Sequence, residues 1–449
     1  MRTEFAIHSN RTLTPEGIKE ATLLIRDGKI ADVVEGKVDT TIETIDVGDS
    51  VLMPGLIDSH VHINEPGRTE WEGFETATKA AAAGGITTLV DMPLNSTPVT
   101  ISAKSFQQKL EATKGKLFVN CGFWGGIVPG NTGDIQALIN AGVLGFKAFL
   151  THSGIDDFPN ASFADLEKAA PLLVKKDLPL LVHAELDWEH EGQKELSKNP
   201  TSYKSYLLSR PKEWEDEAIR QLIELSEKFN LRVHIVHLSS SNSIEQLKAA
   251  RKRGLPITVE TCPHYLFFNA ENIPDADTRF KCAPPIREKA NNDLLLKALK
   301  DGLIDFVVTD HSPAPPDLKK INSGNLQEAW GGIASLQFSL PVMWTLLREN
   351  NFSLEDLSRI MSANVAKFLR MENSKGKIQK GFDADLVVWN PENKFTVHSK
   401  MIHHRHAATP YEGIELSGVV EKTFVVGVNV YDKGSFVSSP TGKIILRNS

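Results

Sequence analysis

The sequence predicts an α/β fold, a TIM (β/α)8 barrel with a small flanking β-sandwich built from both termini. Between residues 54 and 375, eight apolar strand-like runs alternate with helix-like runs, as in a barrel of βα units. Residues 1–53 and 376–449 instead carry short alternating strands, too few at either end for a separate core. We therefore expect these two ends to form one sandwich beside the barrel. The alternative for the middle region is an open doubly wound sheet, but no G-x-G-x-x-G follows a strand to favour it.

The elements follow in chain order. The first 53 residues hold short strands with a turn at Asp27-Gly28. The barrel strands are expected to be nearly continuous apolar runs because both of their faces are covered. Several of the helical segments between them close with Lys or Arg and then Gly, which is a helix-stop signal. The eight expected strands are 56–63, 87–94, 117–126, 145–150, 178–185, 232–239, 256–263 and 305–312.

Composition limits the classes of function. The chain has 449 residues, 41% of them hydrophobic, and a net charge of -7 without a basic block, so we expect no nucleic-acid partner. The N-terminus "MRTEFAIHSN" lacks the apolar core of a signal peptide, and no apolar run approaches the ~20 residues that span a bilayer. Cys121, Cys262 and Cys282 are scattered and form no C-x-x-C pair. We therefore predict a cytoplasmic protein without a membrane partner, whose three thiols are buried and unpaired.

The stretch "DSHVHINEPGR" (58–68) ends the first expected barrel strand. In a strand, side chains at positions i and i+2 point to the same face, so His60 and His62 lie side by side. Two neutral imidazoles on one face can share a metal ion. The alternative is a pair of hydrogen-bonded core histidines.

Other polar residues occupy the same position on other strands. Functional side chains of a TIM barrel lie at the carboxyl ends of its strands, and these ends meet at one mouth. A joint metal site at that mouth is therefore predicted. Its members are His60, His62, Lys147, His183, His237 and Asp310.

Lys147 lies between Phe146 and Ala148 on the fourth strand, where its cation points into the interior. A buried cation is costly unless it is paired, and a salt bridge to Asp310 or Glu185 would supply the pairing. However, a cation beside metal ligands has the wrong sign of charge. Carboxylation of the amine by carbon dioxide would create a carboxylate able to bridge two metal ions, and the location favours this interpretation.

Several motifs resemble the cyclic amidohydrolase branch of the amidohydrolase superfamily. They are "PGLIDSHVHINEPG", "GFKAFL", "HIVHLSS", "ETCPHYL", "CAPPIRE" and "VVTDHSP", and the resemblance covers nearly the whole chain. It implies two divalent metal ions, with Zn²⁺ expected, bridged by carboxylated Lys147. His60 and His62 would bind one ion together with Asp310, and His183 and His237 would bind the other.

The resemblance also implies a reaction and an assembly. Two bridged metal ions lower the pKa of a water, which attacks a ring amide, and Asp310 acts as the catalytic acid–base that carries the proton. Related enzymes are often tetramers, so a homotetramer is expected. A non-enzymatic scaffold of this fold would lack ligands, whereas here the ligand set is complete.

Asn64 bears on the choice of substrate. Dihydroorotases usually show H-x-H-x-R, whose arginine binds a carboxylate, but this chain has neutral Asn64 at that position. An asparagine can match the ureido tail of allantoin as donor and as acceptor. The stretches "DMPLNSTP" and "TDHSPAPPDLK" are similar to those of allantoinases. We expect hydrolysis of allantoin to allantoate, with hydantoinase/dihydropyrimidinase or dihydroorotase activity as the alternatives.

Further residues are expected near the substrate. Asn95 ends the second strand and can bind substrate, and the alternative is an asparagine that only forms the turn. By resemblance, the backbone at Cys282 contacts the ring. His264 is expected to pack or to support a ligand. We interpret "IHHRH" (402–406) as a surface or inter-domain contact, and the polar segment 186–210 as a loop that gates the mouth.

Overall fold

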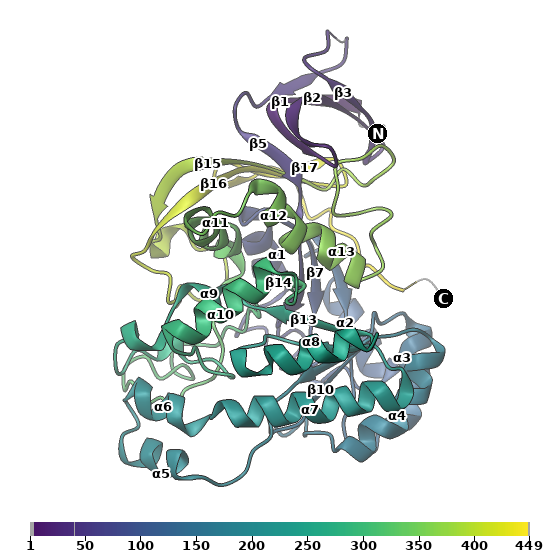
Figure 1. Cartoon of the computed structure of the whole chain (residues 1–449). Coiled ribbons are helices and arrows are strands. Elements are labelled where there is room, and N and C mark those ends of the chain that lie inside the picture. The colour runs from purple at the N-terminus through teal and green to yellow at the C-terminus, as the bar shows by residue number, and fades with distance from the viewer. Residues whose placement is uncertain (1–3, 40, 448–449) are drawn as a thin grey trace.

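The computed structural model describes residues 4–39 and 41–447 and has an α/β architecture with a β-sheet unit above a larger body (Figure 1). Every predicted barrel-strand region contains a strand, and the third region contains two short ones, β8 and β9, on either side of Trp124. These strands are almost entirely buried, which explains their continuous apolar sequence. They are β6 (Leu56–Val61), β7 (Ile86–Asp91), β8 (Asn120–Phe123), β9 (Gly125–Gly126), β10 (Phe146–Phe149), β11 (Leu180–His183), β12 (Val233–Ile235), β13 (Ile257–Thr261) and β14 (Phe306–Val307).

The strands pair in parallel and in chain order. One sheet has the order β6-β7-β8, and in the other, from β9 to β14, each strand pairs with the next one in the sequence. Beyond β14, His311 forms a parallel bridge with Val61, and the His62 N–H donates to the His311 carbonyl at 2.8 Å. The last strand region therefore pairs with the first. This pairing brings the His-x-His segment next to Asp310.

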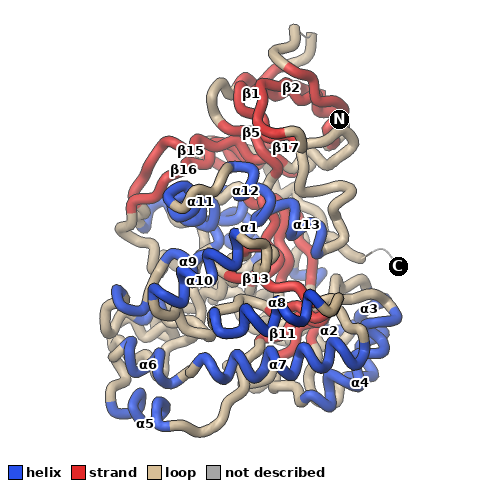
Figure 2. Tube along the Cα trace, in the orientation of Figure 1, coloured by secondary structure: helices blue, strands red, loops and turns tan. Residues whose placement is uncertain are grey.

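Helices form the outer layer around these strands (Figure 2). The predicted stop signals are confirmed where α8 and α10 end, because Gly254 and Gly302 adopt φ values of +81° and +75°, which a residue without Cβ reaches without strain. The helices that follow the strands are α1 (Phe74–Ala83), α2 (Ala103–Ala112), α3 (Thr132–Ala141), α4 (Phe163–Lys175), α5 (Glu191–Lys198), α6 (Tyr203–Ser209), α7 (Lys212–Phe229), α8 (Ile244–Lys252), α9 (Pro263–Phe267), α10 (Lys289–Lys300), α11 (Ser339–Glu349), α12 (Leu354–Ser358) and α13 (Asn364–Phe368).

Both ends of the chain join one nine-stranded sheet. Its order is β18-β17-β16-β15-β5-β1-β2-β3, with β4 paired to β1, so β5 links the N-terminal strands to the C-terminal ones. The sheet curls over a small core in which Phe5 stacks on Phe424 with ring centroids 5.9 Å apart. The division after residues 53 and 375 stays a prediction. The strands are β1 (Glu4–Thr14), β2 (Gly17–Arg26), β3 (Lys29–Glu35), β4 (Thr44–Asp46), β5 (Val51–Pro54), β15 (Leu386–Thr396), β16 (Glu415–Val425), β17 (Val428–Asp432) and β18 (Ser435–Phe436).

The "IHHRH" segment connects the two parts of the chain. His404 is buried, and its ring centroid lies 5.5 Å from that of His311. The Arg405 N–H donates to the Glu72 carboxylate at 3.2 Å, and Glu72 also lies 3.3 Å from His311 Nε2. His404 therefore makes an internal contact at the strand ends, while Arg405 next to it is exposed.

Cys121, Cys262 and Cys282 are free and buried, as predicted. Among the residues that the structure describes, no helix combines the length and the apolar character needed to cross a membrane.

Candidate metal centre and substrate cavity

A cavity of about 610 Å³ opens where the strands end. Its lining includes all the residues predicted as metal ligands, which are His60, His62, Lys147, His183, His237 and Asp310. We refer to these six residues as the ligand cluster. They come from five different strand regions, so the parallel strand order brings them together.

The donor atoms of the ligand cluster lie close to one another. Asp310 Oδ1 is 3.2 Å from His60 Nε2 and 3.5 Å from His62 Nε2. His183 Nδ1 is 3.0 Å from His237 Nε2. One donor atom each from His60, His237 and Asp310 lies within 4.8 Å of the other two, so the histidines expected at the two ions adjoin one another beside Asp310.

Two buried glutamates support histidines of the cluster from behind. Glu260 on β13 lies 2.5 Å from His60 Nδ1 and 3.0 Å from His234 Nε2. Glu185 lies 2.7 Å from His183 Nε2. A carboxylate at one ring nitrogen holds the proton there and leaves the other nitrogen free as a ligand, which is the arrangement of histidines that bind metals. The sequence reasoning did not assign this role to either glutamate.

Three histidines of the cluster are suited to bind as neutral rings. Burial is the main cause that lowers the pKa values of His60, His183 and His237 below their ordinary range. Neutral imidazole is the form that coordinates a metal ion. These three rings therefore offer lone pairs at neutral pH.

Lys147 is buried and its Nζ has no hydrogen-bond partner in the described structure. Lys147 Nζ lies over the Phe149 ring, 4.8 Å from its centroid. Neither Asp310 nor Glu185 forms an ion pair with it among the described residues, so the salt-bridge alternative is not observed. Burial lowers the pKa of Lys147 to about 7, which leaves a substantial share of neutral amine. An orphaned, nucleophilic amine beside metal ligands fits the expected carboxylation.

The backbone is strained at the site. His237 and Asp310 have φ values of +40° and +46°, and Asn64 and Asn95 have +66° and +70°. Left-handed backbone in residues other than glycine costs on the order of 1–3 kcal/mol each and concentrates at functional sites. The strain at two members of the ligand cluster therefore supports a functional role for this cavity.

The three predicted substrate-binding residues differ in position. Asn95 lines the cavity, with Nδ2 3.3 Å from His62 Nδ1. Asn64 and Cys282 are buried and are not among the lining residues. The Asn64 amide donates to the Pro313 carbonyl at 3.4 Å, and the Cys282 carbonyl accepts from the Tyr206 hydroxyl at 2.6 Å. Their contact with substrate stays a prediction.

His264 does not line the cavity either. It is buried against Tyr265, with ring centroids 4.3 Å apart, and neither of its ring nitrogens has a hydrogen-bond partner among the described residues. Burial lowers the pKa of His264 to about 4, so the ring is neutral at physiological pH. This position agrees with the expected packing role.

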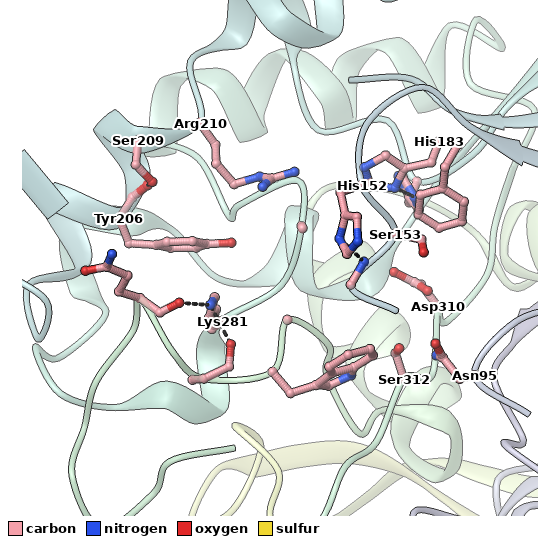
Figure 3. A pocket seen from close by; sticks show the side chains of 18 of the residues that line it. Asn95, His152, Ser153, His183, Tyr206, Ser209, Arg210, Lys281, Asp310 and Ser312 are labelled. Atoms are coloured by element: carbon pink, nitrogen blue, oxygen red, sulfur yellow. Dashed lines mark hydrogen bonds between the residues drawn. The ribbon is translucent and has the colours of Figure 1, made fainter. Parts of the chain in front are cut away.

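The segment 186–210, predicted as a gating loop, contains helices α5 and α6, and it forms one wall of the cavity. Tyr206, Ser209 and Arg210 lie along that wall, across from Asp310 and Asn95 (Figure 3). The cavity thus contains an arginine that the sequence reasoning missed. A single arginine in a polar stretch carries no pattern that would have revealed it.

Parallel strands inside a helical layer bring the six residues of the ligand cluster together in one cavity at the strand ends, an arrangement suited to metal-dependent hydrolysis. Comparison with known proteins refines this. Residues 51–434 match the amidohydrolase family. The chain is 46% identical to the allantoinase of Streptomyces avermitilis over 99% of both chains. It is 45% identical to the allantoinase of Arabidopsis thaliana, over 98% of this chain and 90% of the plant protein.

A solved structure agrees with these matches. The L-hydantoinase (dihydropyrimidinase) from Arthrobacter aurescens superposes with a TM-score of 0.92 at 29% identity, over 99% of each chain. The chain therefore belongs to the amidohydrolase family, and within it to the group that contains the allantoinases.

Proposed function

We propose that this protein hydrolyses the ring amide of allantoin to give allantoate. The observation that carries the reaction type is the complete ligand cluster in one cavity. The choice of allantoin is supported by relatives named allantoinase, which are 45–46% identical over nearly the full length. Hydantoin is the closest rival substrate, because a hydantoinase structure superposes well, although at the lower identity of 29%.

We infer that the ligand cluster holds two divalent metal ions, with Zn²⁺ expected. His60, His62 and Asp310 would hold one ion and His183 with His237 the other, while carboxylated Lys147 would bridge them. When bound, such ions polarise an amide carbonyl and lower the pKa of a water molecule. The glutamates behind His60 and His183 orient these ligands.

Asp310 is the proposed acid–base. It lines the cavity and lies at hydrogen-bonding distance from His60. A carboxylate in this place takes the proton of the attacking water and returns it to the departing ring nitrogen. No other carboxylate among the described residues combines a position in the cavity with contact to the histidines of the first strand: Glu185 and Glu260 are not in the lining, and Glu328 makes no such contact.

We further infer that the β6–β14 strands form a closed barrel and that the terminal sheet forms the flanking sandwich. The parallel pairing of Val61 with His311 supports closure, and the packing of Phe5 on Phe424 supports a sandwich. The homotetramer and the cytoplasmic location stay predictions.

The test is a substrate panel. Purified, metal-loaded protein is assayed with allantoin, hydantoin, dihydrouracil and dihydroorotate, and kcat/KM is compared. We expect the highest value for allantoin, with Asp310→Asn protein as the control for contaminating hydrolases. A higher kcat/KM for dihydroorotate or dihydrouracil would refute the proposal. Equal values for hydantoin and allantoin would show that the ureido tail is not recognised and that the enzyme is a general hydantoinase.

A further inference from the structure

Arg210 follows the last residue of α6, and its guanidinium extends into the cavity (Figure 3). Its Nε donates to Glu185 Oε1 at 3.1 Å and its Nη2 to Glu185 Oε2 at 2.5 Å. Glu185 is buried and lies 2.7 Å from His183 Nε2. The bidentate ion pair fixes the guanidinium plane relative to a member of the ligand cluster.

The third nitrogen of Arg210 remains available. Among the described residues, Nη1 donates to no acceptor. This nitrogen is not buried, and it faces the cavity. Apart from Lys147, the only other lysine or arginine in the described lining is Lys281. The Lys281 ammonium already donates to the carbonyls of Gln327 and Ala329. Lys281 therefore keeps one free N–H, whereas Arg210 keeps both N–H groups of Nη1, so Arg210 has the larger unused hydrogen-bonding capacity of the two.

Glu185 also determines what kind of acceptor suits Arg210. The carboxylate matches the charge of the guanidinium, so the pair has no net charge that would favour an anion. An Nη1 group in this setting suits a neutral carbonyl oxygen. This distinguishes Arg210 from an unpaired arginine, which forks onto a substrate carboxylate.

Acceptors for amide N–H groups lie beside Arg210 on the same wall. The Ser209 hydroxyl donates to the Tyr206 carbonyl at 2.7 Å, and the Tyr206 hydroxyl donates to the Cys282 carbonyl at 2.6 Å. Each hydroxyl keeps lone pairs that can accept, and both residues line the cavity. The wall thus offers one strong donor next to two acceptors, which is the complement of a ureido group.

We propose that Arg210 is a specificity-determining residue that donates from Nη1 to the carbonyl oxygen of the ureido tail of the substrate. The proposal rests on the proposed function, because hydantoin has the same ring without this tail. The rival role is purely structural, in which Arg210 only holds Glu185 and, through it, His183. The two roles differ in their effect on the two substrates.

The experiment measures kcat/KM for allantoin and for hydantoin in wild type and in Arg210→Lys, together with metal content. A lysine keeps a positive charge for Glu185 but has no second nitrogen, in the place of Nη1, that could reach the tail. We expect the ratio of kcat/KM for allantoin to kcat/KM for hydantoin to fall about 10- to 100-fold, which is the usual effect of losing a hydrogen bond to a charged donor. The fall should come mainly from a higher KM for allantoin. Metal content should remain close to that of wild type.

Arg220→Lys is the matched control. Arg220 lies on α7, pairs with Glu217 and Glu224, is half exposed, and is not among the residues that line the cavity. The same substitution there should leave the ratio unchanged. If Arg210→Lys protein does not fold or does not hold metal, Arg210→Gln provides the second variant, because its amide can still donate to Glu185.

The outcomes separate the two proposals. If kcat/KM falls equally for both substrates, or does not fall at all, their ratio is unchanged. This result would overturn the role of Arg210 and leave the proposal of allantoin hydrolysis intact. A wild-type protein that hydrolyses hydantoin but not allantoin would instead refute the proposed function.

Discussion

The buried ion pair between Lys109 and Asp91 supports the strand that carries the first two histidines. Lys109 on α2 donates from Nζ to Asp91 Oδ2 at 2.5 Å and to the Met92 carbonyl at 3.0 Å. Asp91 Oδ1 accepts from the backbone N–H of Ile63 at 2.9 Å, next to His62. Both side chains are almost inaccessible, at 1% and 0% exposure. The pair therefore connects α2 to the position of His62.

Lys109→Met removes the cation and keeps a side chain of similar length. It leaves the Asp91 carboxylate buried without a partner, and breaking a buried pair in this way costs about 3–5 kcal/mol. The double variant Lys109→Met/Asp91→Asn removes both charges, and the asparagine oxygen can still accept from Ile63. We expect the double variant to recover about 2 kcal/mol of this loss, because neighbouring sites that share an interaction are not additive.

The assay is urea unfolding of the metal-free protein, followed by far-UV circular dichroism, for wild type, both single variants and the double variant. Metal content after reloading gives a second measurement, since a displaced Ile63 backbone would move His62. We expect Lys109→Met to hold less metal than the double variant. A broken buried pair should cost several kcal/mol. The reasoning would be refuted if the free energy of unfolding of Lys109→Met were within about 1 kcal/mol of the wild-type value. It would also be refuted if the double variant were no more stable than Lys109→Met.

Three further predictions follow from the site and its surroundings. Lys147→Ala should lose most bound metal and activity, and a small carboxylic acid at high concentration should restore part of both, measured by metal analysis and turnover. Asp310→Asn should fold and keep much of its metal while kcat falls by more than the ~10²–10⁴ typical of general acid–base catalysis. Burial lowers the pKa of His404 from 6.5 to about 3, so the unfolded chain takes up a proton first and stability is lost as the pH falls below 6.5. Between pH 7 and 5.5 this costs about 1 kcal/mol, and thermal melts of His404→Phe should show a smaller drop in Tm than wild type.

Each of these has a contrary result. Full activity of Lys147→Ala without added acid would exclude a bridging carboxylate, and a kcat of Asp310→Asn within tenfold of wild type would assign the proton to another group. Equal acid sensitivity of wild type and His404→Phe would mean that His404 is not held neutral by burial.

The strand regions and the ligand positions could be predicted from the sequence because both depend on local patterns. Apolar runs such as the one ending at His62 record burial on both faces, and parallel strands bring their carboxyl ends together. His60, His183 and Asp310 could therefore be assigned to one mouth before any contact was known, and the structure places them around one cavity. Such predictions require only the type of element and the position of a residue within that element, and both can be inferred from the sequence.

The tertiary structure alone decided what surrounds these ligands. Glu260 reaches His60 from 200 positions further along the chain, and His404 packs against His311 from a different part of the fold. Asn64 follows the His-x-His strand directly, yet it is not among the residues that line the cavity, whereas Arg210 enters that lining from a helix end. These positions depend on how helices and loops pack across the strands. A contact between distant segments leaves no periodic trace in one sequence, so side-chain partners beyond the strand ends follow only from the folded structure.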